Sequence, residues 1–181
     1  MSTPPVHVCE LPVPVRVDPS TAAWSVDGMP VLLIPRHLWV RVQKSLEEGL
    51  GLAAARAMFW EASHSAAKTW CTQQGERFQL AGAPLFEHYL RSAGSRGYGR
   101  MTPLHIDLAL GTAQVKVEQS VYAAEYGPQA GRAVCHVFEG SLAGGLSCAS
   151  ERAGLPGGWS ARETACACNG APHCLFELRR T

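Results

Sequence analysis

The chain has 181 residues, and its 46% hydrophobic content is enough to build the core of one domain. Its formal net charge is +1 and it has no long run of Lys or Arg, so we expect neither a nucleic acid nor an anionic membrane as partner. The apolar runs are far shorter than a membrane span, and residues 1–17 do not form a signal peptide, which favours a cytoplasmic protein.

The first 35 residues predict an extended segment followed by a hairpin. Residues 1–12 contain three prolines and show no periodicity. Valines at alternate positions and then Asp27-Gly28, a pair typical of two-residue turns, predict short antiparallel strands. The apolar run at residues 31–34 has too few neighbours in sequence to cover it. We therefore assign residues 1–35 to dimerisation and expect a homodimer.

Three helices are predicted in the next sixty residues. The first begins after Pro35, which suits the start of a helix, and ends near Gly49. The second covers residues 52–74, with an apolar stripe that includes Met58, Phe59 and Trp70. The third covers residues 84–93, and the glycine-rich stretch after it is a loop.

The second half of the chain predicts strands around one further helix. Two strands, residues 100–110 and 114–120, are followed by a connection at residues 120–130 that contains the breaker Gly127-Pro128. A helix at residues 131–152 contains Gly140, Gly144 and Gly145. Glycines weaken a helix by about 1 kcal/mol each, so their presence indicates close approach of another element or of a ligand. A short strand precedes Glu163, and residues 174–178 form the final strand.

Glu163, Cys166 and Cys174 form the pattern Glu-x2-Cys-x7-Cys, in which an Asn-Gly-Ala-Pro turn can fold one thiolate toward the other. Two cysteines on a short loop cannot complete a tetrahedral zinc site, so another ligand must come from a distant segment, and Cys135 is the best candidate. Seven cysteines cannot all pair within one chain, which favours thiols that bind metal. Other possible ligands lie nearby: His136, Cys148, Cys168 and His173.

Four features carry a resemblance to a known family: residues 107–111, Tyr126-Gly127, Cys135 five residues before Gly140, and the Glu-x2-Cys-x7-Cys pattern ending in Cys-x-Phe176. With these features, residues 36–181 resemble the 4-vinyl reductase domain. This small-molecule-binding domain is found in bacteriochlorophyll-biosynthesis proteins and in transcriptional activators that sense aromatic hydrocarbons. The resemblance implies an α+β fold with helices packed on an antiparallel sheet, shared with subunits of a Golgi transport tethering complex.

The resemblance also implies the metal and its role. In the aromatic-sensing members a zinc ion is held by ligands that correspond here to Cys135, Glu163, Cys166 and Cys174. Such a zinc would pin the C-terminal strand, and four protein ligands leave no open position for catalysis. The same members dimerise through their N-terminal segment. The ATPase and helix-turn-helix segments of those activators are not in this sequence, so we expect a separate protein partner to receive any signal.

The helices and the sheet are expected to enclose an apolar pocket for a small hydrophobic or aromatic molecule. The position of the tryptophan that contacts phenol in the sensors falls near Gln119. The candidate lining residues are Phe59, Trp60, Tyr89, Tyr98, Gln119, Phe138 and Gly144.

The preferred hypothesis is therefore a non-catalytic sensor or carrier with a structural zinc. A first alternative is an enzyme or accessory protein of tetrapyrrole vinyl reduction, although no Gly-x-Gly-x-x-Gly pattern for a hydride donor follows a strand. A second alternative is a tethering subunit, for which the metal pattern would be unnecessary.

Overall fold

The computed structural model describes residues 15–181, and the extended lead-in predicted for residues 1–12 lies outside the described residues. The chain divides into two units, one up to Leu33 and one from Ile34 to Thr181. In the first unit, β1 (Val15–Val17), β2 (Trp24–Val26) and β3 (Met29–Val31) form an antiparallel sheet in that order. Asp27 and Gly28 both have positive φ, as a tight hairpin turn between β2 and β3 requires, which confirms the predicted hairpin.

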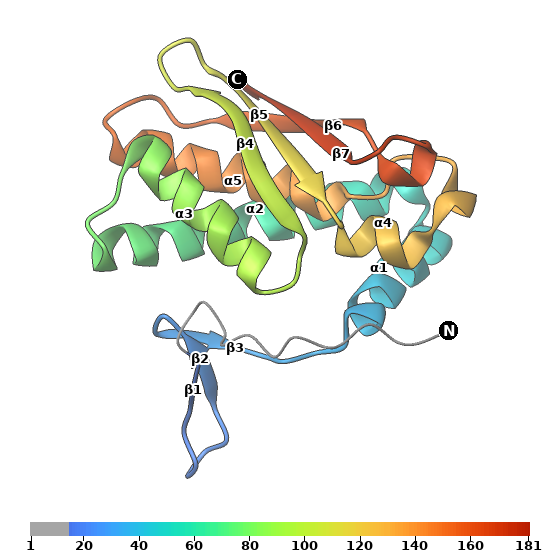
Figure 1. Ribbon diagram of the computed structural model, residues 1–181, viewed down its shortest axis with the longest axis horizontal. Helices are drawn as coiled ribbons and strands as arrows, with labels where there is room; N and C mark the ends of the chain where they lie inside the picture. Colours follow the sequence, from blue (N-terminus) through green and yellow to red (C-terminus); the bar gives the residue numbers. More distant parts are fainter. Residues whose placement is uncertain (1–14) are drawn as a thin grey trace, which may run out of the picture. The chain divides into compact units, whose positions relative to one another are not determined.

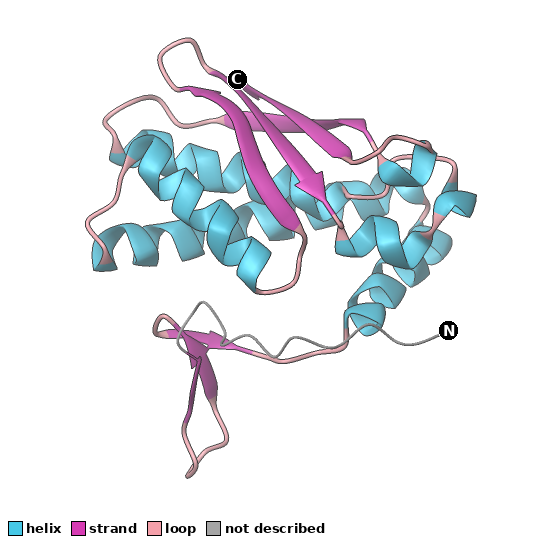
Figure 2. Cartoon of the chain, viewed as in Figure 1, coloured by secondary structure: helices cyan, strands magenta, loops and turns pink. Residues whose placement is uncertain are grey.

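The second unit is an α+β fold, as predicted (Figure 1). Its four-stranded antiparallel sheet has the order β4-β5-β7-β6, and Figure 2 shows helices packed on one face of that sheet. No helix among residues 15–181 combines the length and the apolarity needed to cross a bilayer. The elements are α1 (Arg36–Leu50), α2 (Leu52–Arg77), α3 (Gly82–Ser95), β4 (Arg100–Asp107), β5 (Thr112–Glu118), α4 (Val121–Tyr126), the 3-10 turn η1 (Pro128–Ala130), α5 (His136–Arg152), β6 (Trp159–Ala165), the 3-10 turn η2 (Ala167–Asn169) and β7 (Cys174–Arg180).

Buried and more exposed residues alternate along β5 and β7, so one face of the sheet is buried. In β5, Ala113, Val115 and Val117 are buried, whereas the residues between them are partly exposed. Val115 lies opposite Phe176 of β7, and both side chains are fully buried. The buried face packs on α5, whose residues 136–150 are all buried, so α5 is the central helix of the unit.

The glycines of α5 allow α2 to approach its backbone closely. A Cβ atom at Gly140 would collide with the carbonyl oxygen of Trp60, and one at Gly144 with that of His64. Of the two explanations left open by the sequence, an approaching helix or a ligand, the structure shows the helix. The packing therefore accounts for Gly144 without a ligand.

The structure corrects three of the predicted elements. Residues 120–130, predicted as a connection, contain a short helix, which Ser120 caps by accepting a hydrogen bond from Ala123 N. The glycine-rich helix begins at His136, five residues later than predicted, after Gly131 adopts a left-handed conformation. The stripe predicted on α2 is partly wrong: Phe59 and Trp70 are buried as predicted, but Met58 is exposed. The buried residues also include Ala67 and Cys71.

Candidate metal centre

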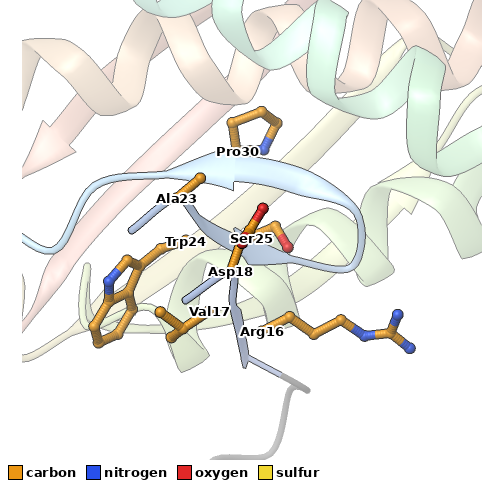
Figure 3. Close-up of a pocket in the computed structure, with 7 residues that line it drawn as sticks. All are labelled: Arg16, Val17, Asp18, Ala23, Trp24, Ser25 and Pro30. Carbon is orange, nitrogen blue, oxygen red and sulfur yellow. The ribbon is translucent and has the colours of Figure 1, made fainter. Parts of the chain in front are cut away.

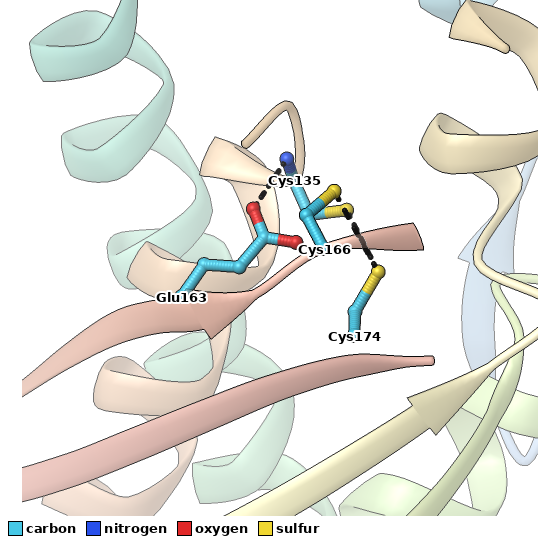
Figure 4. A group of neighbouring side chains, drawn as sticks. All are labelled: Cys135, Glu163, Cys166 and Cys174. Carbon is cyan, nitrogen blue, oxygen red and sulfur yellow. Dashed lines mark hydrogen bonds between the residues drawn. The ribbon is translucent and has the colours of Figure 1, made fainter. Parts of the chain in front are cut away.

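The four predicted metal ligands meet at one end of α5. Cys135 immediately precedes α5, Glu163 lies on β6, Cys166 follows β6 and caps η2, and Cys174 is the first residue of β7 (Figure 4). A register irregularity in β6 lies between Glu163 and Ala165, just before Cys166. Such bulges change the direction of the following side chains, which helps both Glu163 and Cys166 to face the same site.

The distances within the cluster are those of a compact site. The potential ligand atoms of the four residues all lie within 4.8 Å of one another. The Sγ atom of Cys174 is 3.7 Å from that of Cys135 and 3.9 Å from that of Cys166. Glu163 Oε2 accepts a hydrogen bond of 3.1 Å from Cys135 N. All four residues are buried.

This geometry fits a tetrahedral metal ion. Zinc–sulfur bonds of about 2.3 Å at tetrahedral angles separate two sulfur ligands by about 3.8 Å. The two sulfur–sulfur distances, 3.7 and 3.9 Å, bracket that value. In addition, Glu163 Oε1 is buried without a hydrogen-bond partner among the described residues. A buried carboxylate oxygen without a partner is costly, and a bound cation would satisfy it.

The pKa shifts within the cluster also favour binding of a cation. Burial raises the pKa of Glu163 to about 8. Hydrogen bonds with Cys135 and Cys174 lower the pKa of the Cys166 thiol, and the contacts with Cys166 and Cys174 together with burial raise the pKa of Cys135. Without a metal the four acidic groups cannot all ionise together in this buried place. A divalent cation would offset their charge.

The structure separates these four residues from the other possible ligands suggested by the sequence. Cys168 Sγ donates to Ala123 O at 3.3 Å, and burial raises the pKa of this thiol to about 11. His136 Nε2 lies 3.2 Å from Glu47 Oε1. Cys148 Sγ lies 3.5 Å from the hydroxyl of Thr72 on α2. Neither these three residues nor His173 belongs to the cluster.

Polar side chains that the sequence did not single out hold Cys135 in place. Ser120 Oγ lies 3.3 Å from Cys135 Sγ. Gln43 of α1, which is fully buried, donates to the carbonyl oxygen of Val134 at 2.8 Å. Glu47, one turn further along α1, pairs with Arg132. The contacts of Gln43 and Glu47 attach the segment before α5 to α1. Neither contribution was visible in the sequence, because the helix that Ser120 caps was predicted as part of a connection and Gln43 reads as a surface residue.

The predicted ligand-contacting residues fall into three classes. Phe59, Tyr89 and Phe138 are buried, Trp60 and Tyr98 are half-buried, and Gln119 is exposed after the end of β5. The rings of Tyr98 and Phe138 lie 6.4 Å apart, and Phe138 also contacts Tyr122 at 5.0 Å.

The other aromatic candidates have different neighbours. Phe59 contacts Trp39, Tyr89 contacts Trp70 and Phe86, and Trp60 stacks on His64. The structure thus brings Tyr98 and Phe138 together. It adds a pair absent from the sequence-based list, in which Trp39 Nε1 donates to the Tyr122 hydroxyl at 2.7 Å.

A separate hollow of about 400 Å³ lies within the N-terminal unit (Figure 3). Its walls come from all three strands of the hairpin sheet and the turn after β1. Trp24 is 38% exposed, and Val17 is 49% exposed. The lining residues are Arg16, Val17, Asp18, Ala23, Trp24, Ser25 and Pro30.

Several solved structures resemble this fold, and two of them have informative ligands. The phenol-responsive sensory domain of the transcription activator PoxR, solved with phenol, has a TM-score of 0.76 and 21% sequence identity, and the match covers 92% of this chain and 84% of that one. Trafficking protein particle complex subunit 3 from Naegleria fowleri, covalently bound to palmitic acid, has a TM-score of 0.50 and 10% identity, with 81% and 95% coverage. At these identities the similarity establishes the fold.

No curated protein matches the chain in sequence. One family does match: the family described as "Domain of unknown function (DUF5943)" aligns with residues 10–104, which is just over half of the 181 residues. That stretch includes the hairpin sheet, the helices α1 to α3 and the start of β4. The chain therefore belongs to the DUF5943 family.

Proposed function

We propose that this chain is a non-catalytic sensor or carrier module of the 4-vinyl reductase type, which binds a small hydrophobic or aromatic molecule and contains a structural zinc ion. The observation that supports it best is the fold shared with the phenol-responsive domain of PoxR, over 92% of this chain. The trafficking subunit with this fold carries palmitic acid, an apolar molecule. Both relatives thus accommodate an apolar ligand in this architecture.

Zinc would be held by Cys135, Glu163, Cys166 and Cys174. The ion would supply a positive charge and a crosslink, joining the start of α5 to β6 and β7. Four protein ligands fill a tetrahedral shell, so no position is left for a reacting water or substrate. The proposed role is therefore structural, in keeping with a binding module.

The proposed ligand site lies among the aromatic side chains beside α5. We place Tyr98 and Phe138, whose rings lie 6.4 Å apart, at its centre. Phe59, Trp60 and Tyr89, which contact other aromatic side chains, remain candidates for its edge. A site lined by these side chains would favour an aromatic or aliphatic molecule oriented by one or two hydrogen bonds. The Tyr122 hydroxyl, which accepts a hydrogen bond from Trp39, is better placed for such a bond than Gln119, because Tyr122 is buried and Gln119 is exposed.

We also propose a homodimer formed through residues 1–35, in a cytoplasmic protein that reports to a protein partner. The support is the small N-terminal sheet, which exposes Trp24 and Val17. Leu32 and Leu33, which follow β3, are 87% and 81% exposed. Exposed apolar side chains next to open strand edges are typical of a surface that pairs with another chain. Light scattering at micromolar concentration should give about twice the 19.4 kDa mass of the chain.

The zinc site can be tested by metal analysis of protein purified without chelator. We expect one zinc per chain, and its loss in Cys166→Ser and Cys174→Ser. Cys168→Ser is a matched control, because this neighbouring thiol is buried but directed at Ala123 O. Zinc well below half an equivalent in the unmodified protein, or unchanged zinc in both ligand variants, would refute the assignment.

The ligand can be tested by a thermal-shift screen over phenols, alkylbenzenes, fatty acids and porphyrin precursors. A ligand at about a hundred times its dissociation constant stabilises the folded state by roughly 2.7 kcal/mol, so at least one class should raise the melting temperature. If none of these ligand classes raises the melting temperature, the proposed sensor function is contradicted. A coloured tetrapyrrole bound to the purified protein would favour the accessory role in vinyl reduction.

A further inference from the structure

Glu139 is a buried acidic residue in the first turn of the glycine-rich helix α5. It is 2% exposed. Burying a carboxylate is costly unless it is paired and hydrogen-bonded, so a carboxylate at this place needs specific partners. The partners of Glu139 lie on two other elements, α2 and β6.

The first partner is Arg56 of α2, which binds Glu139 through two parallel hydrogen bonds. Arg56 Nε lies 2.9 Å from Glu139 Oε2, and Arg56 Nη2 lies 2.6 Å from Oε1. The guanidinium group is partly exposed, whereas the carboxylate is almost completely buried. Such a bidentate pair fixes the orientation of the carboxylate as well as its position.

The second partner is the backbone of the metal ligand Glu163. Glu163 N donates to Glu139 Oε1 at 2.9 Å. Strand β6 is an edge strand of the sheet, so backbone groups on its outer edge have no neighbouring strand to bind. Glu139 thus supplies an acceptor for Glu163 N next to the point where β6 becomes irregular.

These contacts form a closed set around the metal ligands. Glu139 holds the backbone of Glu163, and Glu163 Oε2 in turn accepts from Cys135 N, at the start of the helix that carries Glu139. Both ends of Glu163 are therefore fixed to α5. The remaining carboxylate oxygen, Oε1, has no hydrogen-bond partner among residues 15–181 and is left for the metal.

We propose that Glu139 is a positioning residue of the metal centre: held by Arg56, it fixes the backbone of Glu163 so that Glu163 Oε1 is directed at the ion. This inference rests on the proposed zinc site. Partners that orient metal ligands typically account for about 10–100-fold in metal affinity. Glu139 should have an effect of this size without being a ligand.

The test compares zinc affinities, measured by competition with a chromophoric chelator, in the full chain and its variants. Glu139→Leu removes the acceptor for Glu163 N and should weaken zinc binding about 10–100-fold. Glu139→Gln retains an acceptor oxygen and should recover part of the loss. Glu151→Gln is the matched control, because Glu151 also joins α5 to α2, through Lys68 at 2.8 Å, but has no contact with a metal ligand. Its zinc affinity should equal that of the unmodified protein.

A second measurement separates positioning from general stability. Cobalt(II) in place of zinc reports coordination geometry through its visible spectrum, and Glu139→Leu should alter that spectrum at a temperature where the metal-free variant is folded. If Glu139→Leu does not fold, Glu139→Asp replaces it in the test. The shorter aspartate side chain cannot reach both Arg56 and Glu163 N, so the zinc affinity of this variant should fall.

The outcomes distinguish this inference from the zinc site itself. Absence of zinc binding by the unmodified protein would overturn the proposed site. Normal zinc binding by the unmodified protein, with the same affinity and cobalt spectrum in the folded Glu139 variant, would leave the zinc site standing and overturn the role of Glu139. Equal losses in the Glu139 and Glu151 variants would also overturn it, because the effect would then come from helix packing alone.

Discussion

Replacing Gly144 by alanine should separate the two helices that form the centre of the main unit. A Cβ atom at this position would overlap the carbonyl oxygen of His64 and would lie 2.9 Å from both Cα and C of His64. These opposing atoms belong to the backbone of α2. They cannot move aside as the end of a flexible side chain could, so one helix must shift relative to the other.

The size of the effect follows from two opposing terms. Overpacking a core costs about 1–3 kcal/mol, and the rigid backbone neighbours place Gly144→Ala at the upper end of that range. Alanine favours the helix over glycine by about 1 kcal/mol. The net loss of unfolding free energy should be about 2 kcal/mol. For a chain of this length, this corresponds to a decrease of about 4–8 °C in melting temperature.

Thermal and urea unfolding followed by circular dichroism, at a fixed zinc concentration, would measure this loss. Gly49→Ala is the matched control: Gly49 lies in the last turn of α1, and an added Cβ would meet nothing within 4 Å. It should raise stability by up to about 1 kcal/mol, since only the helix preference changes. If Gly144→Ala is also stabilising, the described contact between α2 and α5 is wrong.

Three further predictions concern other parts of the chain. In zinc-free protein, burial raises the pKa of Glu163 from 4.5 to about 8, so the folded state holds this proton more tightly and the unfolding free energy should fall between about pH 4.5 and 8. Glu163→Gln should reduce that slope in urea titrations at several pH values, and an unchanged slope would contradict the burial of this carboxyl. Trp39→Phe removes the 2.7 Å hydrogen bond to Tyr122 and should cost about 1 kcal/mol in urea unfolding. Lys68→Met breaks a largely exposed ion pair with Glu151 and should change stability by less than about 1 kcal/mol, so a larger change would show that the pair is better shielded than described.

Three of the four metal ligands could be predicted together because they lie close to one another in the sequence. Glu163, Cys166 and Cys174 lie within twelve residues, and their spacing is enough to suggest a site. Cys135 is separated from Glu163 by 28 positions, and the sequence offered it only as the best distant candidate. The resemblance was needed to rank Glu163 above the nearby cysteines and histidines. The structure brings these four residues together. The strands were predictable for a similar reason, since alternation along β5 is visible in sequence.

Contacts between helices could not be predicted in the same way. Helix α2 carries alanines on every side, so periodicity does not show which face is buried, and Met58 was placed inward although it is exposed. Glu139 reads in sequence as a solvated charge, because its pairing with Arg56 depends on a helix 83 positions away. The glycines of α5 indicated a close neighbour, but only the fold identifies it as α2.

The place of β7 in the sheet has a consequence for synthesis of the protein. Strand β7 follows all other strands in the chain, yet it lies between β5 and β6. A nascent chain that does not yet include residues 174–180 cannot join β6 to the rest of the sheet, and it also lacks Cys174. Until then β5 presents an unpaired edge, the kind of surface that chaperones cover and that aggregates when it does not find its partner. Ribosome pausing or C-terminal truncation before residue 174 should therefore yield an aggregation-prone chain rather than a smaller folded domain.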